Sequence, residues 1–236
     1  MKISDPTQTT VHNEIKLLLD TLDLSDNHIL ELGCGRGDKT RAIANSNLPA
    51  AILALEVDER QHQKNLMMSD LPTVTFERGG AEAIPAADNS FDLVILFKSL
   101  HHVPIEHMDQ ALQEIRRVLK PGGYAWISEP VFDGDLNEVM RLFHNEETVR
   151  QAAFAAVQKA VSDCTLQLKT QLFFRTRSFL ENLDDFDRRM IQVTHSDHQL
   201  SPTVYEAVKT RFNAHCTAEG AQFYPPQRVD LLRKSV

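Results

Sequence analysis

Three glycines at alternate positions mark the segment of this sequence that is best suited to bind a small molecule. Gly33, Gly35 and Gly37 follow the apolar segment 29–32 and precede the segment 38–45, which reads as a helix. Because glycine has no Cβ, such a turn lets a ligand approach the backbone closely. A helix start also directs backbone N–H groups at the ligand. The pattern predicts a binding site at a strand–turn–helix junction.

Two carboxylates narrow the class of ligand. Asp58 ends the next apolar segment, 51–57, and follows Gly37 by 21 residues, a distance at which a second strand can present a carboxylate to a ribose diol. Glu31 stands two residues before the first glycine. A carboxylate there would repel the pyrophosphate of a dinucleotide but attract an ammonium group. The pair therefore favours a nucleoside joined to an amino acid over a dinucleotide.

Four segments together resemble one enzyme family. Glu31-Leu32-Gly33-Cys34-Gly35-Arg36-Gly37 resembles motif I of the class I S-adenosylmethionine (SAM) dependent methyltransferases. The later segments 80–94, 100–103 (Leu-His-His-Val) and 117–123 (Arg-Val-Leu-Lys-Pro-Gly-Gly) resemble further motifs of this family, in its order and at its spacing. The resemblance is strong for residues 25–130 and weak beyond them, apart from 228–233, which resembles a last strand.

The resemblance implies SAM as the methyl donor and S-adenosylhomocysteine (SAH) as the product. Gly80 stands where the family has an aspartate, so a side-chain bond to the adenine amine is expected to be missing, and the Ala81 backbone N–H could bind the ring instead. Lys98 falls where the methionine end of SAM should lie. The residues expected to bind SAM are Glu31, Gly33, Cys34, Gly35, Gly37, Asp58, Gly80, Ala81, Glu82, Phe97 and Lys98.

Candidate catalytic residues follow two later strands. His101 and His102 come after the apolar segment 91–97, and Glu129 follows the segment 124–128. Some small-molecule O-methyltransferases that resemble this chain use a histidine and an acid at these strand ends. By that resemblance His101 is the first candidate for a general base, His102 is the second, and Glu129 orients the ring or accepts a substrate hydrogen bond. Alternatively, one histidine caps the following helix and the other packs in the interior.

Alternating strand and helix patterns predict an α/β fold. Because strand and helix patterns alternate, we expect a doubly wound, mostly parallel sheet with helices on both faces, a Rossmann-like arrangement. The ligand of such a sheet lies beyond the carboxyl ends of its strands. Expected strands are 29–32, 52–57, 74–78, 91–97, 124–128, 166–174 and 227–233; expected helices are 10–22, 38–45, 59–69, 109–119, 136–143, 146–161, 184–191 and 202–219.

The second half of the chain is longer than a simple crossover requires. We expect one domain over residues 1–236, with a core at about 23–132 and 202–236 and a largely helical insertion at about 133–201. The insertion begins after the fifth strand, whose end should face the site. It is interpreted either as a cap over the acceptor or as additional packing on the core.

Composition and charge exclude several classes of protein. The net charge of −8 argues against a nucleic-acid partner, and no apolar run is long enough for a membrane span. The first residues lack the apolar core of a signal peptide, and three sparse cysteines suit a reducing, cytoplasmic location. No Cys-x-x-Cys pair or close His/Cys cluster indicates a metal site, so none is expected.

The sequence thus predicts a SAM-dependent methyltransferase with a small-molecule acceptor, methylated on oxygen or nitrogen. The alternatives are methylation of RNA or protein and a non-catalytic subunit that binds SAM or SAH. The absence of an Asn/Asp-Pro-Pro-Tyr/Phe tetrapeptide after the fourth strand counts against nucleic-acid amines. A homodimer is also compatible with the sequence, which does not determine the oligomeric state.

Overall fold

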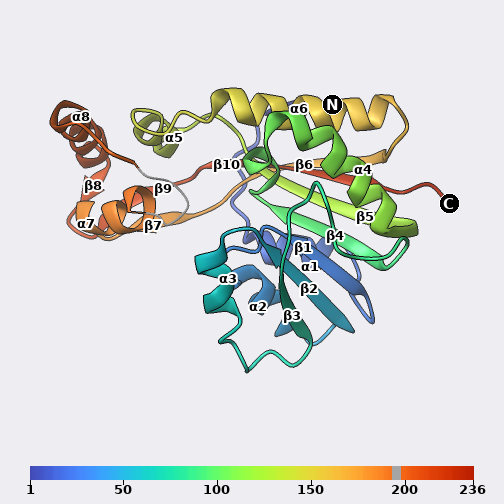
Figure 1. The fold of residues 1–236 in the computed structure, drawn as a ribbon. Helices are drawn as coiled ribbons and strands as arrows, with labels where there is room; N and C mark the ends of the chain where they lie inside the picture. The colour runs from blue at the N-terminus through green and yellow to red at the C-terminus, as the bar shows by residue number, and fades with distance from the viewer. Residues whose placement is uncertain (193–197) are drawn as a thin grey trace.

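A seven-stranded sheet forms the centre of the molecule in the computed structural model, which describes residues 1–192 and 198–236 (Figure 1). Its strand order is β3-β2-β1-β4-β5-β10-β6. The strands are β1 (His28–Leu32), β2 (Ala51–Glu56), β3 (Val74–Arg78), β4 (Phe91–Phe97), β5 (Leu119–Pro130), β6 (Gln167–Arg175) and β10 (Pro226–Arg233). β1 to β5 pair in parallel, whereas β10 runs antiparallel to both β5 and β6.

Helices cover both faces of this sheet. They are α1 (Glu14–Thr21), α2 (Asp38–Ala44), α3 (Glu59–Asn65), α4 (Met108–Val118) and α6 (Glu147–Ser162), with the short helices η1 (Leu100–His102) and η2 (Ile105–His107) before α4. Successive strand residues pack into different clusters, because side chains alternate between the faces of a strand. Ile29 packs with residues of α1 and α2, whereas Leu30 packs with residues of α4 and α6. The expected doubly wound, mostly parallel fold is confirmed.

A separate lobe extends from one side of the sheet, at the left of Figure 1. It has its own apolar core, which includes Val139, Phe186, Val208, Phe212 and Phe223. Its elements are α5 (Asp135–Met140), α7 (Leu183–Phe186), the π-helix η3 (Asp187–Ile191), α8 (Pro202–Asn213) and a small sheet in the order β7-β9-β8 (Ser178–Leu180, Gly220–Phe223, Cys216–Thr217).

The lobe does not coincide with the expected insertion at 133–201. β6 lies within that range but belongs to the central sheet, because it pairs with β10 along almost its whole length. Conversely, α8 lies in the expected core but packs in the lobe, where Val208 and Phe212 are fully buried. The expected helix 202–219 also ends early, at Asn213, since Cys216 and Thr217 pair with β9. Among the described residues, no helix is long and apolar enough to cross a membrane.

Candidate functional site

The glycine turn lies between β1 and α2 with all three glycines in the left-handed region. Their φ angles are 71° at Gly33, 53° at Gly35 and 71° at Gly37. A Cβ at Gly33 would lie 2.7 Å from the Cβ of Ser99, so this position needs glycine for packing. A Cβ at Gly35 would meet no protein atom within 4 Å. Gly35 is therefore the position where the turn faces a space that a ligand can approach.

The carboxylate that contacts this turn belongs to Glu56, the last residue of β2. Its Oε2 accepts a hydrogen bond from the Gly35 N–H at 2.7 Å, and its Oε1 accepts one from the Asp58 N–H at 2.9 Å. The Asp58 carboxylate instead caps α3 and accepts from the N–H groups of Arg60 and Gln61 at 2.9 and 3.4 Å. The structure thus directs Glu56, not the predicted Asp58, at the glycine turn.

Glu31 lies beneath the turn and is only 2% exposed. Its Oε2 accepts a hydrogen bond from the Thr40 hydroxyl of α2 at 2.7 Å. Burial raises the pKa of Glu31 to about 7, although the Thr40 bond opposes this shift. A buried carboxylate with a raised pKa favours a cationic ligand, which would stabilise its ionised form.

Cys34 and Asn65 hold the turn in place. The Asn65 amide donates to the Gly35 carbonyl at 2.8 Å and to the Cys34 sulfur at 3.5 Å. Burial, together with the charges of Glu31 and Glu56, raises the pKa of the Cys34 thiol. Cys34 therefore stays protonated and inert at neutral pH, and its side chain serves packing.

The segment 80–82 lies beyond β3. A Cβ at Gly80 would lie 2.5 Å from both carboxylate oxygens of Glu82, so the Glu82 side chain folds over Gly80. A carboxylate thus stands near the position where an aspartate side chain at residue 80 would begin. Ala81 is buried, and Gly80 forms a β-bridge with Ala83.

At the end of β4, Lys98 adopts a left-handed backbone with φ of 58°, and its N–H donates to the Ser128 carbonyl at 2.7 Å. Burial lowers the pKa of Lys98. The ammonium group of Lys39 lies 4.4 Å from the ring centroid of Phe97 and pairs with Glu14 of α1. Burial and the charge of Lys98 lower the pKa of Lys39 to about 7. The ion pair of Glu14 from α1 with Lys39 from α2 thus lies beside the predicted residue Phe97.

The predicted catalytic residues His101 and Glu129 are in direct contact. His101 Nδ1 hydrogen-bonds to Glu129 Oε2, and Glu129 Oε1 accepts from the Leu100 N–H at 3.0 Å. The opposite ring nitrogen, Nε2, lies 3.5 Å from Oε1 of Glu146, which precedes α6. The rings of His101 and His102 stack with a centroid distance of 4.1 Å.

These two carboxylates set the charge of His101. Burial alone would lower the pKa of His101, but the charges of Glu129 and Glu146, together with the hydrogen bond to Glu129, raise it to about 9. The ring is therefore protonated at neutral pH. Since a general base needs a free lone pair, this arrangement does not support the base role predicted for His101.

Sequence reasoning missed four residues near the predicted site: Glu14, Lys39, Glu56 and Glu146. Glu56 carried a usable signal, because it lies two residues before Asp58 at the same strand end. Glu14 and Lys39 pair from two different helices, and Glu146 meets His101 only through tertiary packing. No local pattern announces contacts of this kind.

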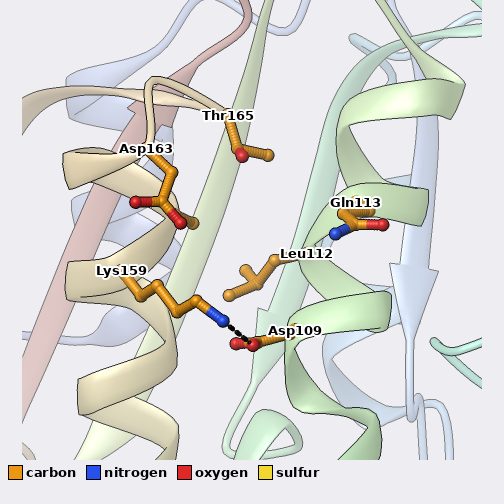
Figure 2. A pocket seen from close by; sticks show the side chains of 7 residues that line it. Asp109, Leu112, Gln113, Lys159, Asp163 and Thr165 are labelled. Atoms are coloured by element: carbon orange, nitrogen blue, oxygen red, sulfur yellow. Dashed lines mark hydrogen bonds and ion pairs between the residues drawn. The ribbon is translucent and has the colours of Figure 1, made fainter.

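One surface pocket lies away from this site, between α4 and α6 (Figure 2). An ion pair of Lys159 with Asp109 crosses it, and Asp163 follows α6 at the same end. Glu146, by contrast, precedes the first turn of α6. The pocket and the histidines are thus at opposite ends of this helix.

Comparison with known proteins shows which family of domains the first half of this chain resembles. Residues 29–123 match the family model of a methyltransferase domain. The phthiotriol/phenolphthiotriol dimycocerosates methyltransferase of Mycobacterium tuberculosis is 34% identical over 103 residues, which cover 44% of this chain and 37% of that protein. Methyltransferase GfsG of Streptomyces halstedii is 31% identical over 140 residues, or 57% of this chain and 49% of that protein. The chain thus matches less than half the length of these relatives.

Solved structures share the fold over almost the whole chain. The YcgJ protein of Bacillus subtilis has a TM-score of 0.67 at 18% identity, covering 94% of this chain and 98% of that one. A structure described as a putative methyltransferase from Bacillus halodurans has a TM-score of 0.66 at 16% identity, covering 94% and 99%. At this identity the likeness shows the fold alone.

Proposed function

Because this chain carries a domain of the class I SAM-dependent methyltransferases, we propose that it transfers a methyl group from SAM to a small-molecule acceptor. One observation carries the proposal: the Gly35 turn with Glu56 and the His101–Glu129 pair follow neighbouring parallel strands of one sheet. SAM supplies an electrophilic methyl group on a sulfonium. The residues of the chain bind and align the two reactants, and alignment alone can supply much of the rate.

The residues fit the parts of SAM in three places. Gly35 admits the ligand, and Glu56 beside it is suited to the ribose hydroxyls; we propose it for this role in place of Asp58. Buried Glu31 suits the positive charge of the methionine end. Glu82 over Gly80 offers a carboxylate that can accept from the adenine amine, and the Ala81 N–H can donate to a ring nitrogen.

The acceptor class follows from the relatives and the charge. The relative from Mycobacterium tuberculosis is named for phthiotriol and phenolphthiotriol dimycocerosates. We propose a small molecule with a hydroxyl group for this chain as well, with His101, His102 and Glu129 on the acceptor side. The net charge of −8 opposes a nucleic-acid acceptor.

Turnover with isotopically labelled SAM tests this proposal. Incubation with a mixture of hydroxylated lipids and polyketides is expected to yield SAH and a labelled small molecule, whereas Gly35→Val is expected to yield neither. Label in added RNA or protein would support the alternative acceptors. SAM binding without SAH from any acceptor would support a non-catalytic subunit.

His101→Ala tests the acceptor side separately. We expect turnover to fall by about 10²-fold, the loss that misplacement of a reactant by about 1 Å can cause. SAM affinity is expected to change little, because we propose His101 for the acceptor side and not for the SAM side. Calorimetry with SAM beside steady-state rates checks both, and an unchanged rate would remove His101 from the active site.

A further inference from the structure

We propose that His101, His102 and Glu146 form a binding site for one divalent transition-metal ion of the Zn²⁺ class. One nitrogen of each histidine and one carboxylate oxygen of Glu146 all lie within 4.8 Å of one another. Imidazole and carboxylate groups are usual ligands of such ions. The three residues come from η1 and from the start of α6, so the fold brings them together.

The spacing of two of these atoms fits a shared ion better than a direct hydrogen bond. His101 Nε2 and Glu146 Oε1 are 3.5 Å apart. A hydrogen bond between such groups usually measures about 2.7–3.2 Å. Two ligand atoms at about 2.0–2.1 Å from a tetrahedral ion are separated by roughly 3.3 Å. To bind one ion, the two side chains need only small shifts, and Nε2 of His101 must release its proton, as metal binding generally requires.

The ring of His101 is already oriented as in known metal sites. A histidine that binds a metal through one nitrogen commonly donates its other N–H to a carboxylate. His101 Nδ1 bonds to Glu129, which is itself fixed by the Leu100 N–H. This pair leaves Nε2 directed at Glu146, the side on which the ion is proposed.

The third ligand, Glu146, is held by two neighbours. Its Oε2 accepts from Arg150 Nη2 at 2.5 Å, and its Oε1 accepts from His144 Nε2 at 2.8 Å. A carboxylate oxygen has two lone pairs, so Oε1 can accept this bond and still bind an ion. Because these two contacts already restrict the orientation of the Glu146 carboxylate, it loses less conformational freedom when it binds the ion.

The donor set decides the class of ion. Mg²⁺ and Ca²⁺ prefer oxygen ligands alone, whereas two imidazoles with one carboxylate suit Zn²⁺ and late first-row ions. Three protein ligands also leave a coordination position open, as in catalytic rather than structural zinc sites. The open position can take an oxygen atom of a second reactant.

The role of the ion rests on the proposed methyl transfer. An acceptor hydroxyl bound at the open position would have a lower pKa and would lose its proton to solvent. The oxygen then forms the new bond to the methyl carbon as the carbon–sulfur bond of SAM breaks, and that electron pair stays on the sulfur of SAH. The acceptor would be activated without a free imidazole base.

Zinc titration of the purified full chain tests the site without any methyl acceptor. The background carries Cys164→Ser and Cys216→Ser, because both thiols are exposed and could bind zinc. We expect one Zn²⁺ per chain by calorimetry, and at least about tenfold weaker binding in His102→Ala and in Glu146→Gln. His107→Ala, an exposed neighbour on η2, is the matched control and should bind normally.

Two outcomes would overturn the proposal. One is the absence of stoichiometric binding, and the other is binding that survives both His102→Ala and Glu146→Gln in protein whose circular dichroism is unchanged. The visible spectrum of the Co²⁺ form gives a second readout, since the loss of its tetrahedral bands in Glu146→Gln would assign this residue as a ligand. SAM binding and SAH formation are measured apart, so stoichiometric zinc with no methyl transfer would contradict the proposed function alone.

Discussion

Two neighbouring carboxylates at the end of β2 have different tasks. Glu56 contacts the Gly35 N–H, whereas Asp58 caps α3. We expect Glu56→Gln to weaken SAM binding about tenfold to a hundredfold, because charge-assisted hydrogen bonds contribute about 1.5–3 kcal/mol. Asp58→Ala is the matched comparison and should mainly cost about 1 kcal/mol of stability through the lost cap. Calorimetry with SAM and thermal unfolding of both variants separate the two roles. If Asp58→Ala weakened SAM binding more than Glu56→Gln, Asp58 would be the residue that binds the ribose.

Glu31 should make SAM binding depend on pH. Its pKa is raised to about 7 by burial, and only the ionised form attracts the ammonium group of SAM. We therefore expect affinity to rise with pH through this value and to be up to about tenfold weaker at roughly pH 6 than at roughly pH 8. Titrations in buffers of different ionisation enthalpy should show proton release near neutral pH. Lys39, which also titrates here, is the competing group, and Lys39→Met should keep the Glu31 dependence.

The same carboxylate lowers the stability of the protein without its ligand. Because the folded pKa of Glu31 is raised from 4.5 to about 7, its stability contribution is lost as pH rises between these two values. Glu31→Gln keeps an acceptor for the Thr40 hydroxyl and removes the buried charge. We expect a higher melting temperature than the parent above neutral pH, weaker SAM binding and no pH dependence from this group. A lower melting temperature would show that the ionised carboxylate is stabilised by other contacts.

At the scale of elements, the lobe core is expected to govern acceptor binding. Phe212 of α8 is fully buried and packs on Phe186 and Phe223, with ring centroids 5.1 and 6.1 Å away. Phe212→Ala should destabilise the lobe by about 3–5 kcal/mol. We expect a higher KM for the acceptor and an unchanged Kd for SAM, whose proposed site lies on the sheet. Phe179→Ala, at 39% exposure on the same lobe, is the control; equal effects of both variants on KM would argue against a cap.

For the whole molecule, a buried ion pair joins distant parts of the chain. Arg228 and Asp230 of β10 pair at 2.8 Å with 3% and 0% side-chain exposure. Arg228 also donates to the Ile3 carbonyl and lies over the ring of Phe154 on α6. Asp230→Ala leaves the guanidinium buried without its partner and should cost about 3–5 kcal/mol. Urea denaturation measures this loss.

The matched control for this pair is the exposed one of Lys16 with Asp20 on α1. Asp20→Ala should change stability by no more than about 0.5 kcal/mol, since exposed helix pairs contribute little. If Asp230→Ala lowered the stability as little as Asp20→Ala, water or another group would have to contact the Arg228 guanidinium in its place. The double variant Arg228→Met with Asp230→Leu should recover much of the lost stability, because apolar side chains of similar volume can replace a buried pair.

The sequence by itself determined the sheet and the glycine turn. Apolar runs such as 91–97 are buried on both faces, and this pattern depends only on local composition. Gly33, Gly35 and Gly37 have a left-handed backbone that few other residues adopt. The turn could therefore be predicted from the positions of its glycines, without knowledge of any tertiary contact. The local pattern also located His101 and Glu129 at the ends of two strands that are neighbours in the sheet.

Tertiary structure decided which side chains meet. Glu56 and Asp58 are both carboxylates at the end of one strand, so the sequence alone does not distinguish them as ligands of the ribose. In the structure the Asp58 side chain caps the start of α3. The sequence predicts one insertion at about 133–201, but β6 pairs with β10 in the central sheet, and α8, from the expected core, packs in the lobe. Glu146 joined His101 because α6 packs beside η1. Such contacts depend on the sum of many packing energies along the chain, which no local spacing of residues encodes.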